Sequence, residues 1–182
     1  MKIRTMENDV HLAIWKAIGA NPTPMAYGEV YTALQQKTID AQENPNDSNY
    51  LSKFCEVTDH CIQTKHVYTP YLALMSESFY QSLPDDLKTV VEEAAKEAGD
   101  YEIGLCATND EDYKAKLNEA GCTVVELTPE ERQLFIDKTN EAGIRDLVKE
   151  KSENPELTDE FFAEVDAVTS GTSTPAADSA AS

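Results

Sequence analysis

The segment GANPTPMAYGEVYTALQQKTIDAQENP, from Gly19 to Pro45, decides how the chain is expected to fold. Its beginning is predicted to be a loop, because Pro22 and Pro24 stiffen the backbone there. Residues 29–36 have apolar side chains at helical spacing, which predicts an amphipathic helix. The inward-facing residues of that helix are Val30, Ala33 and Leu34. The following TIDA, residues 38–41, is too short for a helix and predicts a buried strand.

The sequence on either side continues this alternation of short strands and helices. Residues 2–5 predict a strand, and residues 9–18 predict a helix that Asn8 or Asp9 caps and Gly19 ends. Further strands are predicted at residues 66–76 and 122–127, and further helices at residues 50–57, 84–117, 128–151 and 158–168. The pattern indicates an α/β fold, and 182 residues are enough for one domain with a real core.

Three of these elements carry specific signals. HVYTPYLALMS, residues 66–76, is dense in aromatic and aliphatic side chains and is the clearest strand candidate, with Pro70 marking a bulge or an edge. The long helix starts at Pro84, which two acidic residues follow at the positive end of the helix dipole. Residues 128–131, TPEE, form a capping box with proline at the first helical position, so a helix is expected to begin there.

The composition argues against several classes of function. A formal net charge of -19 and a pI near 4.3 make nucleic acid and anionic membrane surfaces poor partners. No apolar run approaches the roughly 20 residues of a membrane span, and Met1 does not open a signal peptide. The sequence has no glycine-rich phosphate loop and no GxSxG or HExxH motif, so no cofactor is expected.

The four cysteines show no metal-binding pattern. Cys55, Cys61, Cys106 and Cys122 have neither CxxC nor zinc-ribbon spacing, so no metal site is expected. We interpret them as reduced, partly buried thiols that pack like small apolar residues. Two disulfides are possible by number, but the sequence does not pair them.

Arg4 is the first candidate for ligand binding. It follows an apolar residue in a predicted strand and stands near the start of a helix, so it can point into a cleft. Its guanidinium fork matches the geometry of a carboxylate. The alternative is a surface arginine paired with Glu7 or Glu29.

Asn44 and Tyr27 are two further candidates. Pro45 pushes the backbone of Asn44 toward an extended form, so its amide can project from the chain rather than cap a helix. An ordinary Asn-Pro turn is the alternative. Tyr27 ends the proline-stiffened loop and can stack on a ligand or pack in the core.

An enzyme is the alternative class of function. Asp59, His60, Cys61 and His66 lie close in sequence, but the spacing H-C-x4-H matches no standard metal pattern. A Cys–His nucleophile needs proximity in space that the sequence does not show. This alternative is an acidic α/β enzyme that uses His60 and Cys61.

Four segments taken together resemble one protein family. They are KIRTMEN at residues 2–8, the block at residues 19–45, KFCEV at residues 53–57 and HVYTPYLALMS at residues 66–76. In this order and spacing they resemble the dicarboxylate-receptor (DctP) family, the substrate-binding proteins of TRAP transporters, from Lys2 to about Val168. The resemblance implies the second lobe of a two-lobed periplasmic-binding-protein-like fold, with a crossing strand and a long inter-lobe helix. It implies a receptor without enzymatic activity or cofactor, which closes on an organic acid and delivers it to the small and large subunits of a membrane permease.

The resemblance also implies roles for single residues. Arg4 stands where the family's arginine grips the ligand carboxylate with two hydrogen bonds, and Asn44 where an asparagine bonds the same carboxylate. Tyr27 stands where an aromatic side chain packs over the ligand. Glu7 lies where relatives carry a ligand-contacting polar residue, and an acid there requires a hydroxyl, an amine or a proton from the ligand.

The main departure from the family lies at the start of the chain. Relatives carry a signal peptide and a whole first lobe before the KIR strand, so we expect residues 1–168 to be the C-terminal portion of a receptor. The full-length protein is then expected in the periplasm or on the outer face of the cytoplasmic membrane; a nonfunctional gene fragment is a third interpretation. Residues 169–182 should form a disordered tail, since they cannot bury area. Without the first lobe, the chain should bind organic acids poorly and leave the crossing strand without neighbours.

Overall fold

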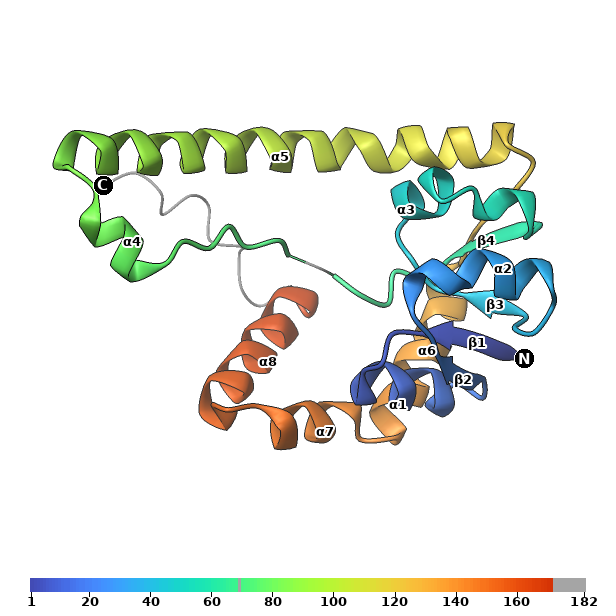
Figure 1. Ribbon diagram of the computed structural model, residues 1–182. Coiled ribbons are helices and arrows are strands. Elements are labelled where there is room, and N and C mark those ends of the chain that lie inside the picture. Colours follow the sequence, from blue (N-terminus) through green and yellow to red (C-terminus); the bar gives the residue numbers. More distant parts are fainter. Residues whose placement is uncertain (69, 172–182) are drawn as a thin grey trace.

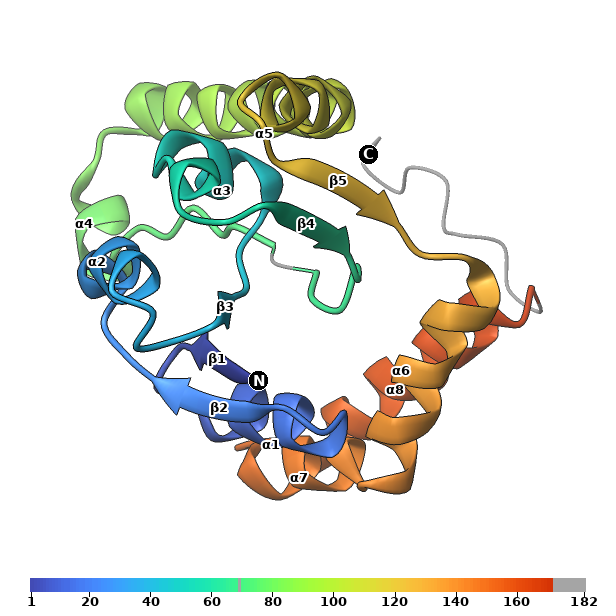
Figure 2. The same cartoon turned by 90° about the vertical axis from the view of Figure 1, so that its right-hand side faces the viewer.

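The computed structural model describes residues 1–68 and 70–171, which form a body of short strands and helices with one very long helix beside it (Figure 1). The body contains a three-stranded sheet and a two-stranded sheet. Figure 2 shows the three-stranded sheet next to α1, and the two-stranded sheet next to α5. The predicted α/β class is confirmed.

The three-stranded sheet is entirely parallel, in the order β2-β1-β3. β1, Lys2–Thr5, is the central strand, and β3, Ala41–Gln42, pairs with it on one side. The strand predicted at residues 38–41 is therefore correct only at Ala41, because residues 38–40 form the turn that leads into β3. Arg4 stands opposite Gln42 in this register.

The loop predicted at the two prolines is wrong, because Asn21–Pro24 forms the edge strand β2. The N–H of Asn21 donates to Met1 O, and the N–H of Met25 donates to Thr5 O. Successive N–H groups of a strand point to opposite sides, so Pro22 and Pro24 occupy positions that face away from β1. A residue without an N–H costs nothing at such positions, which is why an edge strand tolerates proline.

Two helices follow the strands of this sheet. α1, Asp9–Ala17, begins where the side chain of Asn8 accepts hydrogen bonds from Val10 N and His11 N, as the cap prediction requires. A 3-10 turn, Tyr27–Glu29, leads into α2, Val30–Gln35. The main apolar cluster joins α2 to the turn after α3; it consists of Val30, Ala33, Leu34, Ile39 and Phe54.

The two-stranded sheet consists of β4, His60–Gln63, and β5, Thr123–Glu126, which pair in parallel. The strand predicted at residues 122–127 is confirmed, whereas β4 was not predicted. The helix expected at residues 50–57 begins earlier, as α3, Asn46–Leu51. It is followed, after Lys53 at φ 57°, by a short 3-10 helix, Phe54–Glu56.

The strand predicted at residues 66–76 is wrong for its described residues, which form no strand. Figure 1 shows this segment running away from the sheets toward α4, Glu77–Ser82. Tyr68 and Tyr71 are each 91% exposed. An apolar sequence becomes a strand only where a sheet edge can accept its hydrogen bonds, and the described part of the chain provides no such edge beside this segment.

The long helix α5, Asp85–Glu119, closely matches the prediction for residues 84–117. Gly99 and Gly104 lie inside it without ending it. Its C-terminal part contacts α3 and β5, while its N-terminal part extends past the body (Figure 1). Within residues 1–68 and 70–171, no helix is both long and apolar enough to span a bilayer.

The C-terminal helices are α6, Pro129–Glu141, α7, Ile144–Lys151, and α8, Pro155–Thr169. The capping box at Thr128 is confirmed, but the single helix predicted for residues 128–151 is wrong. Gly143 adopts φ 65° and separates α6 from α7, because glycine accepts this left-handed conformation readily. α8 ends at Thr169, and residues 172–182 of the tail predicted to be disordered lie outside the described residues.

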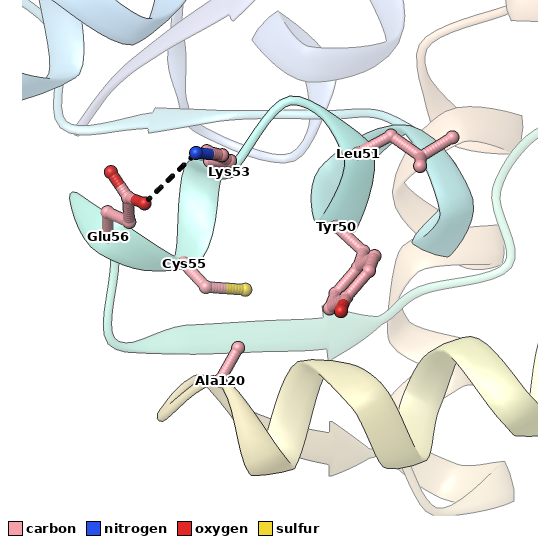
Figure 3. Close-up of a pocket in the computed structure, with 6 residues that line it drawn as sticks. All are labelled: Tyr50, Leu51, Lys53, Cys55, Glu56 and Ala120. Carbon is pink, nitrogen blue, oxygen red and sulfur yellow. Dashed lines mark ion pairs between the residues drawn. The ribbon is translucent and has the colours of Figure 1, made fainter.

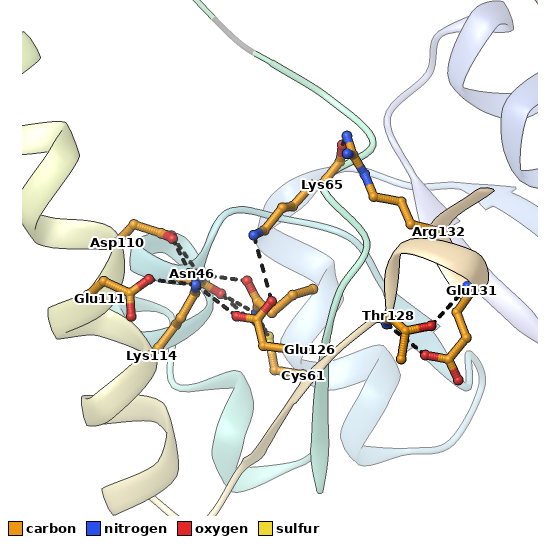
Figure 4. A network of polar contacts seen from close by, with 11 residues as sticks. Asn46, Cys61, Lys65, Asp110, Glu111, Lys114, Glu126, Thr128, Glu131 and Arg132 are labelled. Carbon is orange, nitrogen blue, oxygen red and sulfur yellow. Dashed lines mark hydrogen bonds and ion pairs between the residues drawn. The ribbon is translucent and has the colours of Figure 1, made fainter. Parts of the chain in front are cut away.

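A polar network connects α5 to the two-stranded sheet (Figure 4). The Lys114 ammonium lies 2.8 Å from Glu111, 2.8 Å from Glu126 and 3.3 Å from Asp110. Lys65 also faces Glu126, at 3.7 Å. The hydrogen bond to Glu111, which has the larger effect, and the hydrogen bond to Glu126 both raise the pKa of Lys114 above its usual value. The hydrogen bond from Lys114 also lowers the pKa of Glu126.

The lowered pKa of Glu126 predicts a specific response to acid. A carboxyl group whose pKa is lower in the folded state stabilises the fold above its unfolded pKa of about 4.3, and this contribution is lost as the pH falls through the folded value. We therefore expect Glu126→Gln to lose less stability than the parent between about pH 5 and pH 3, measured by thermal unfolding at stepped pH. Glu97→Gln, on the exposed surface of α5, should keep the parent's slope. If Glu126→Gln and the parent showed the same dependence of thermal stability on pH, the lowered pKa of Glu126 would be contradicted.

Candidate functional site

The candidate site lies at the carboxyl ends of the three parallel strands. β1, β2 and β3 all end at the same edge of the sheet, since they are parallel. The segments that leave this edge begin at Met6, Met25 and Glu43. In open α/β sheets, ligands bind outside the carboxyl ends of the strands. This edge is therefore where a small molecule is expected to meet the lobe.

Arg4 is held within this edge rather than on the surface. Arg4 is only 4% exposed, and its Nε donates a hydrogen bond to Met25 O at 2.9 Å. Among the described residues, no carboxylate lies within 4.0 Å of the guanidinium. Arg4 therefore forms no ion pair with Glu7 or Glu29, which was the alternative interpretation. The two terminal nitrogens have no hydrogen-bond partner in that part of the chain, and they are not among its fully enclosed unpartnered atoms. They keep contact with solvent and can accept an anionic ligand.

Tyr27 lies beside Arg4, at the start of the 3-10 turn that leads from β2 into α2. The guanidinium carbon of Arg4 is 5.9 Å from the centre of the Tyr27 ring. The tyrosine hydroxyl hydrogen-bonds with the Ser52 hydroxyl, and the ring packs edge-on against Phe54 with centroids 6.0 Å apart. The residue is nevertheless 45% exposed. The ring is thus packed on one side and open to solvent on the other. Tyr27 can therefore pack against the core and also stack on a ligand.

Asn44 is held by two other amide side chains. Its Nδ2 donates to Gln42 Oε1 at 2.6 Å, and Asn49 Nδ2 donates to the Asn44 carbonyl at 3.0 Å. Gln42 Nε2 donates in turn to Asn49 Oδ1 at 2.8 Å. Residues opposite each other in parallel strands project from the same face, so Gln42 and Arg4 share a face. The amide of Asn44 therefore joins that same side of the sheet edge, and its second Nδ2 hydrogen has no partner among the described residues.

Glu7 is not brought into this group. It is exposed after β1, and within residues 1–68 and 70–171 it forms no ion pair. Arg4 and Tyr27 are in contact, Asn44 reaches their face through Gln42, and Glu7 remains apart.

Three residues near the site were not predicted from the sequence: Gln42 and Asn49, which orient Asn44, and Glu43, whose carboxylate lies next to them. Glu43 Oε1 lies 3.8 Å from His11 Nδ1, and its Oε2 lies 3.4 Å from His66 Nε2. Side chains alternate between the two faces of an extended segment. This alternation in QEN, residues 42–44, could have predicted that the amides of Gln42 and Asn44 share one face and that Glu43 lies on the other.

Cys61 and His60 do not form a nucleophile–base pair. They are adjacent on β4, so their side chains point to opposite faces of the strand. The Cys61 thiol instead contacts the amide of Gln63 at 3.3 Å and that of Asn46 at 3.6 Å. Burial raises the pKa of the Cys61 thiol, which keeps it protonated and weakly nucleophilic. Within the described residues, no group of three or more His, Cys, Asp or Glu side chains is arranged to hold a metal ion.

One hollow lies elsewhere, between the turn after α3 and the C-terminal end of α5 (Figure 3). Its volume is about 390 Å³, and Lys53 and Glu56 form an ion pair at its wall. The lining residues are Tyr50, Leu51, Lys53, Cys55, Glu56 and Ala120. None of the candidate ligand-binding residues takes part in it.

Comparison with known proteins gives a consistent family match. The sequence model of the DctP family, described as bacterial extracellular solute-binding protein, family 7, matches residues 1–147. The 2,3-diketo-L-gulonate-binding periplasmic protein of Escherichia coli K12 is 36% identical over 137 residues, which are 75% of this chain and 41% of that protein. The C4-dicarboxylate-binding periplasmic protein of Rhodobacter capsulatus is 36% identical over 133 residues, covering 72% of this chain and 40% of that protein.

Solved structures agree with the sequence relatives. A TRAP periplasmic solute-binding protein from Ochrobactrum anthropi superposes with a TM-score of 0.82 at 37% identity, covering 94% of this chain and 52% of that chain. The ectoine-binding protein of a TRAP transporter from Halomonas elongata superposes with a TM-score of 0.80 at 32% identity, covering 91% and 55%. The chain thus spans about half the length of the proteins it resembles.

Proposed function

Because the chain belongs to the DctP family of bacterial extracellular solute-binding proteins, we propose that it forms the ligand-binding lobe of a TRAP-transporter receptor for an organic acid. The observation that carries this proposal is the buried guanidinium of Arg4, which no carboxylate of the described residues neutralises, at the carboxyl edge of a parallel sheet. The match to about half of each solved TRAP receptor fits the predicted single lobe with a long helix.

One local cation can outweigh a distant negative surface charge. At physiological salt, charges beyond roughly 8 Å are largely screened, so most of the net charge of -19 has little influence at Arg4. A hydrogen bond to a charged group contributes about 1.5–3 kcal/mol. An acidic protein can therefore bind an organic acid at a single arginine.

The neighbouring residues would complete the recognition of a carboxylate. Arg4 would form two parallel hydrogen bonds to its oxygens through the two terminal nitrogens. Asn44 would donate its remaining Nδ2 hydrogen to the same group, held in place by Gln42. Tyr27 would cover the ligand with the open side of its ring. Glu7 would take part only with a ligand that offers a hydroxyl, an amine or a proton.

The names of relatives support this class of ligand. Two of them are named for binding 2,3-diketo-L-gulonate and C4-dicarboxylates, and a solved relative from Advenella mimigardefordensis holds galactonate. A dicarboxylate or a sugar acid would fit the same arginine. The receptor would work outside the cytoplasm, in the periplasm or at the outer face of the cytoplasmic membrane, and would pass the acid to the small and large permease subunits. In this proposal, residues 1–168 supply the ligand-binding lobe, the segment at residues 66–76 that crosses between the lobes, and the helices, and residues 169–182 form a tail.

A thermal-shift ligand screen tests this proposal, with the protein used as its source cell produces it. We expect a C4-dicarboxylate, a sugar acid or a keto acid to raise the melting temperature, because a bound ligand stabilises the folded state by mass action. Succinamide, the uncharged analogue of succinate, should give no shift. Alkylation of Cys61 should leave the rise in melting temperature on ligand addition unchanged. The receptor function would be contradicted if alkylation abolished this rise, or if none of the acids raised the melting temperature.

The isolated chain should bind the same acids weakly. Only one wall of a cleft is expected in it, and binding pockets gain most of their affinity by enclosing the ligand. The exposed residues Tyr68, Tyr71 and Leu74 fit a surface that a first lobe would cover. We expect calorimetry on the 182-residue chain to give a Kd no tighter than about 1 mM. Micromolar binding by this chain alone would show that one wall is sufficient.

A further inference from the structure

Three polar residues of α3 follow one another at a spacing of three, so they lie on one side of this helix. They are Asn46, Asn49 and Ser52, the last of which is the C-terminal cap. Asn46 and Asn49 are only 8% and 7% exposed. Burying an amide costs free energy unless hydrogen bonds replace those to water. The partners of these side chains therefore indicate what this polar face of α3 does.

Asn49 closes a ring of hydrogen bonds at the candidate site. Its Oδ1 accepts from Gln42 Nε2 at 2.8 Å, and its Nδ2 donates to the Asn44 carbonyl at 3.0 Å. Gln42 Oε1 in turn accepts from Asn44 Nδ2 at 2.6 Å. Asn49 therefore fixes the backbone of Asn44 directly and its side-chain amide through Gln42.

Ser52 holds the aromatic member of the site from the same face of α3. Its hydroxyl hydrogen-bonds with the hydroxyl of Tyr27. Phe54, which is 2% exposed, packs edge-on against the Tyr27 ring two residues further along the chain. A ring that is held at both its hydroxyl and its edge has little freedom to rotate before a ligand arrives.

Asn46 fixes the other end of α3 to two separate elements (Figure 4). Its Nδ2 donates to Gln63 Oε1 of β4 at 3.0 Å and to Asp110 Oδ1 of α5 at 2.7 Å. Its Oδ1 accepts from Gln63 Nε2 at 2.9 Å. Because these hydrogen bonds are directional, they hold α3 in one orientation more specifically than apolar packing would.

We propose that the polar face of α3 positions the ligand site, with Asn49 acting through Asn44 and Ser52 acting through Tyr27. This inference rests on the proposed function, because it assumes that Asn44 and Tyr27 contact an organic acid. Asn49 and Ser52 themselves need not touch the ligand. They hold the amide and the ring in the binding geometry beforehand, so that less conformational entropy is lost when the acid binds.

Double-mutant cycles measure whether each residue acts through its partner. In the form of the protein used for the ligand screen, Asn49→Ala should raise the Kd of the identified acid about tenfold, and Ser52→Ala about threefold. Asn49→Ala should change the Kd less than about twofold when Asn44→Ala is already present. Ser52→Ala should likewise have little effect when Tyr27→Phe has removed its partner hydroxyl. Additive effects in either cycle would overturn the role of that residue.

Two further variants separate positioning from a general disturbance of α3. Ser52→Thr keeps the hydroxyl and should bind like the parent. Leu51→Ala changes another side of the helix, at a residue that is 67% exposed, and should also bind like the parent. Equal losses of affinity in Leu51→Ala and Asn49→Ala would overturn the inference. Ser52 is only half-buried, so its arm of the experiment remains decisive if Asn49→Ala does not fold.

NMR spectroscopy of the ligand-free 182-residue chain tests the positioning without any ligand. Asn49→Ala should shift the side-chain amide signals of Asn44, and Ser52→Ala should shift the ring signals of Tyr27. Leu51→Ala should leave both sets of signals in place. Unchanged Asn44 and Tyr27 signals in the first two variants would overturn the inference. If these signals shift but no acid binds, the positioning is supported and only the proposed function fails.

Discussion

Replacing Arg4 by methionine should lower the affinity of the receptor for its organic acid at least a hundredfold. Methionine keeps much of the side-chain volume at this buried position but removes both hydrogen bonds that the fork would make to the ligand. At about 1.5–3 kcal/mol each, two such bonds amount to roughly 3–6 kcal/mol, and every 1.4 kcal/mol is tenfold in Kd. Calorimetry with the acid identified in the ligand screen measures the change directly.

Two further variants make the Arg4 result specific. Arg4→Lys keeps the positive charge but loses the planar fork, so its affinity should lie between the parent and Arg4→Met. Arg132→Met removes an exposed arginine of α6, whose contact is with the Lys65 carbonyl at 3.5 Å, and should bind like the parent. If Arg4→Met stays folded and binds within threefold of the parent, Arg4 is not the anchor of the ligand.

Leu117→Ala should produce the largest loss of stability among single substitutions at the end of α5. Leu117 is 0% exposed and lies where α5 contacts α3 and β5. Truncating a fully buried leucine costs about 2–5 kcal/mol, because both the transfer free energy and the packing around the new cavity are lost. For a chain of this size a loss of about 3 kcal/mol should lower the melting temperature by roughly 6–12 °C.

The control for this prediction is a leucine that is not enclosed. Leu134 on α6 is 64% exposed, so Leu134→Ala should change the free energy of unfolding by no more than about 0.5 kcal/mol. Denaturant unfolding of both variants compares the two costs at one temperature. Equal effects at Leu117 and Leu134 would mean that the end of α5 is not anchored through the buried leucine.

Elements with local signals were predicted well. α5 and α6 start at a proline with acidic residues in the first turn, and these features act within a few residues of the chain. The break at Gly143 was missed, although glycine is a known helix end, because the apolar pattern continues past it. Arg4 and Asn44 were selected with the help of the family resemblance, whereas their supports Gln42 and Asn49 were not selected at all.

Elements that depend on a partner strand were predicted poorly. Pro22 and Pro24 favoured a loop, yet Asn21–Pro24 pairs with β1 because the prolines fall on the side without a neighbour. The apolar residues 66–76 favoured a strand, yet the described residues of this segment have no sheet edge to join. In both cases the result depends on whether hydrogen-bond partners from elsewhere in the chain lie alongside.

The sequence by itself determined the α/β class, the helices with clear caps and the resemblance to a receptor family, because these follow from residue types at short spacing. Only the tertiary structure decided which side chains share a face at the sheet edge. Arg4, Thr23 and Gln42 come from three separate segments, and the parallel hydrogen-bond register between their strands sets them side by side.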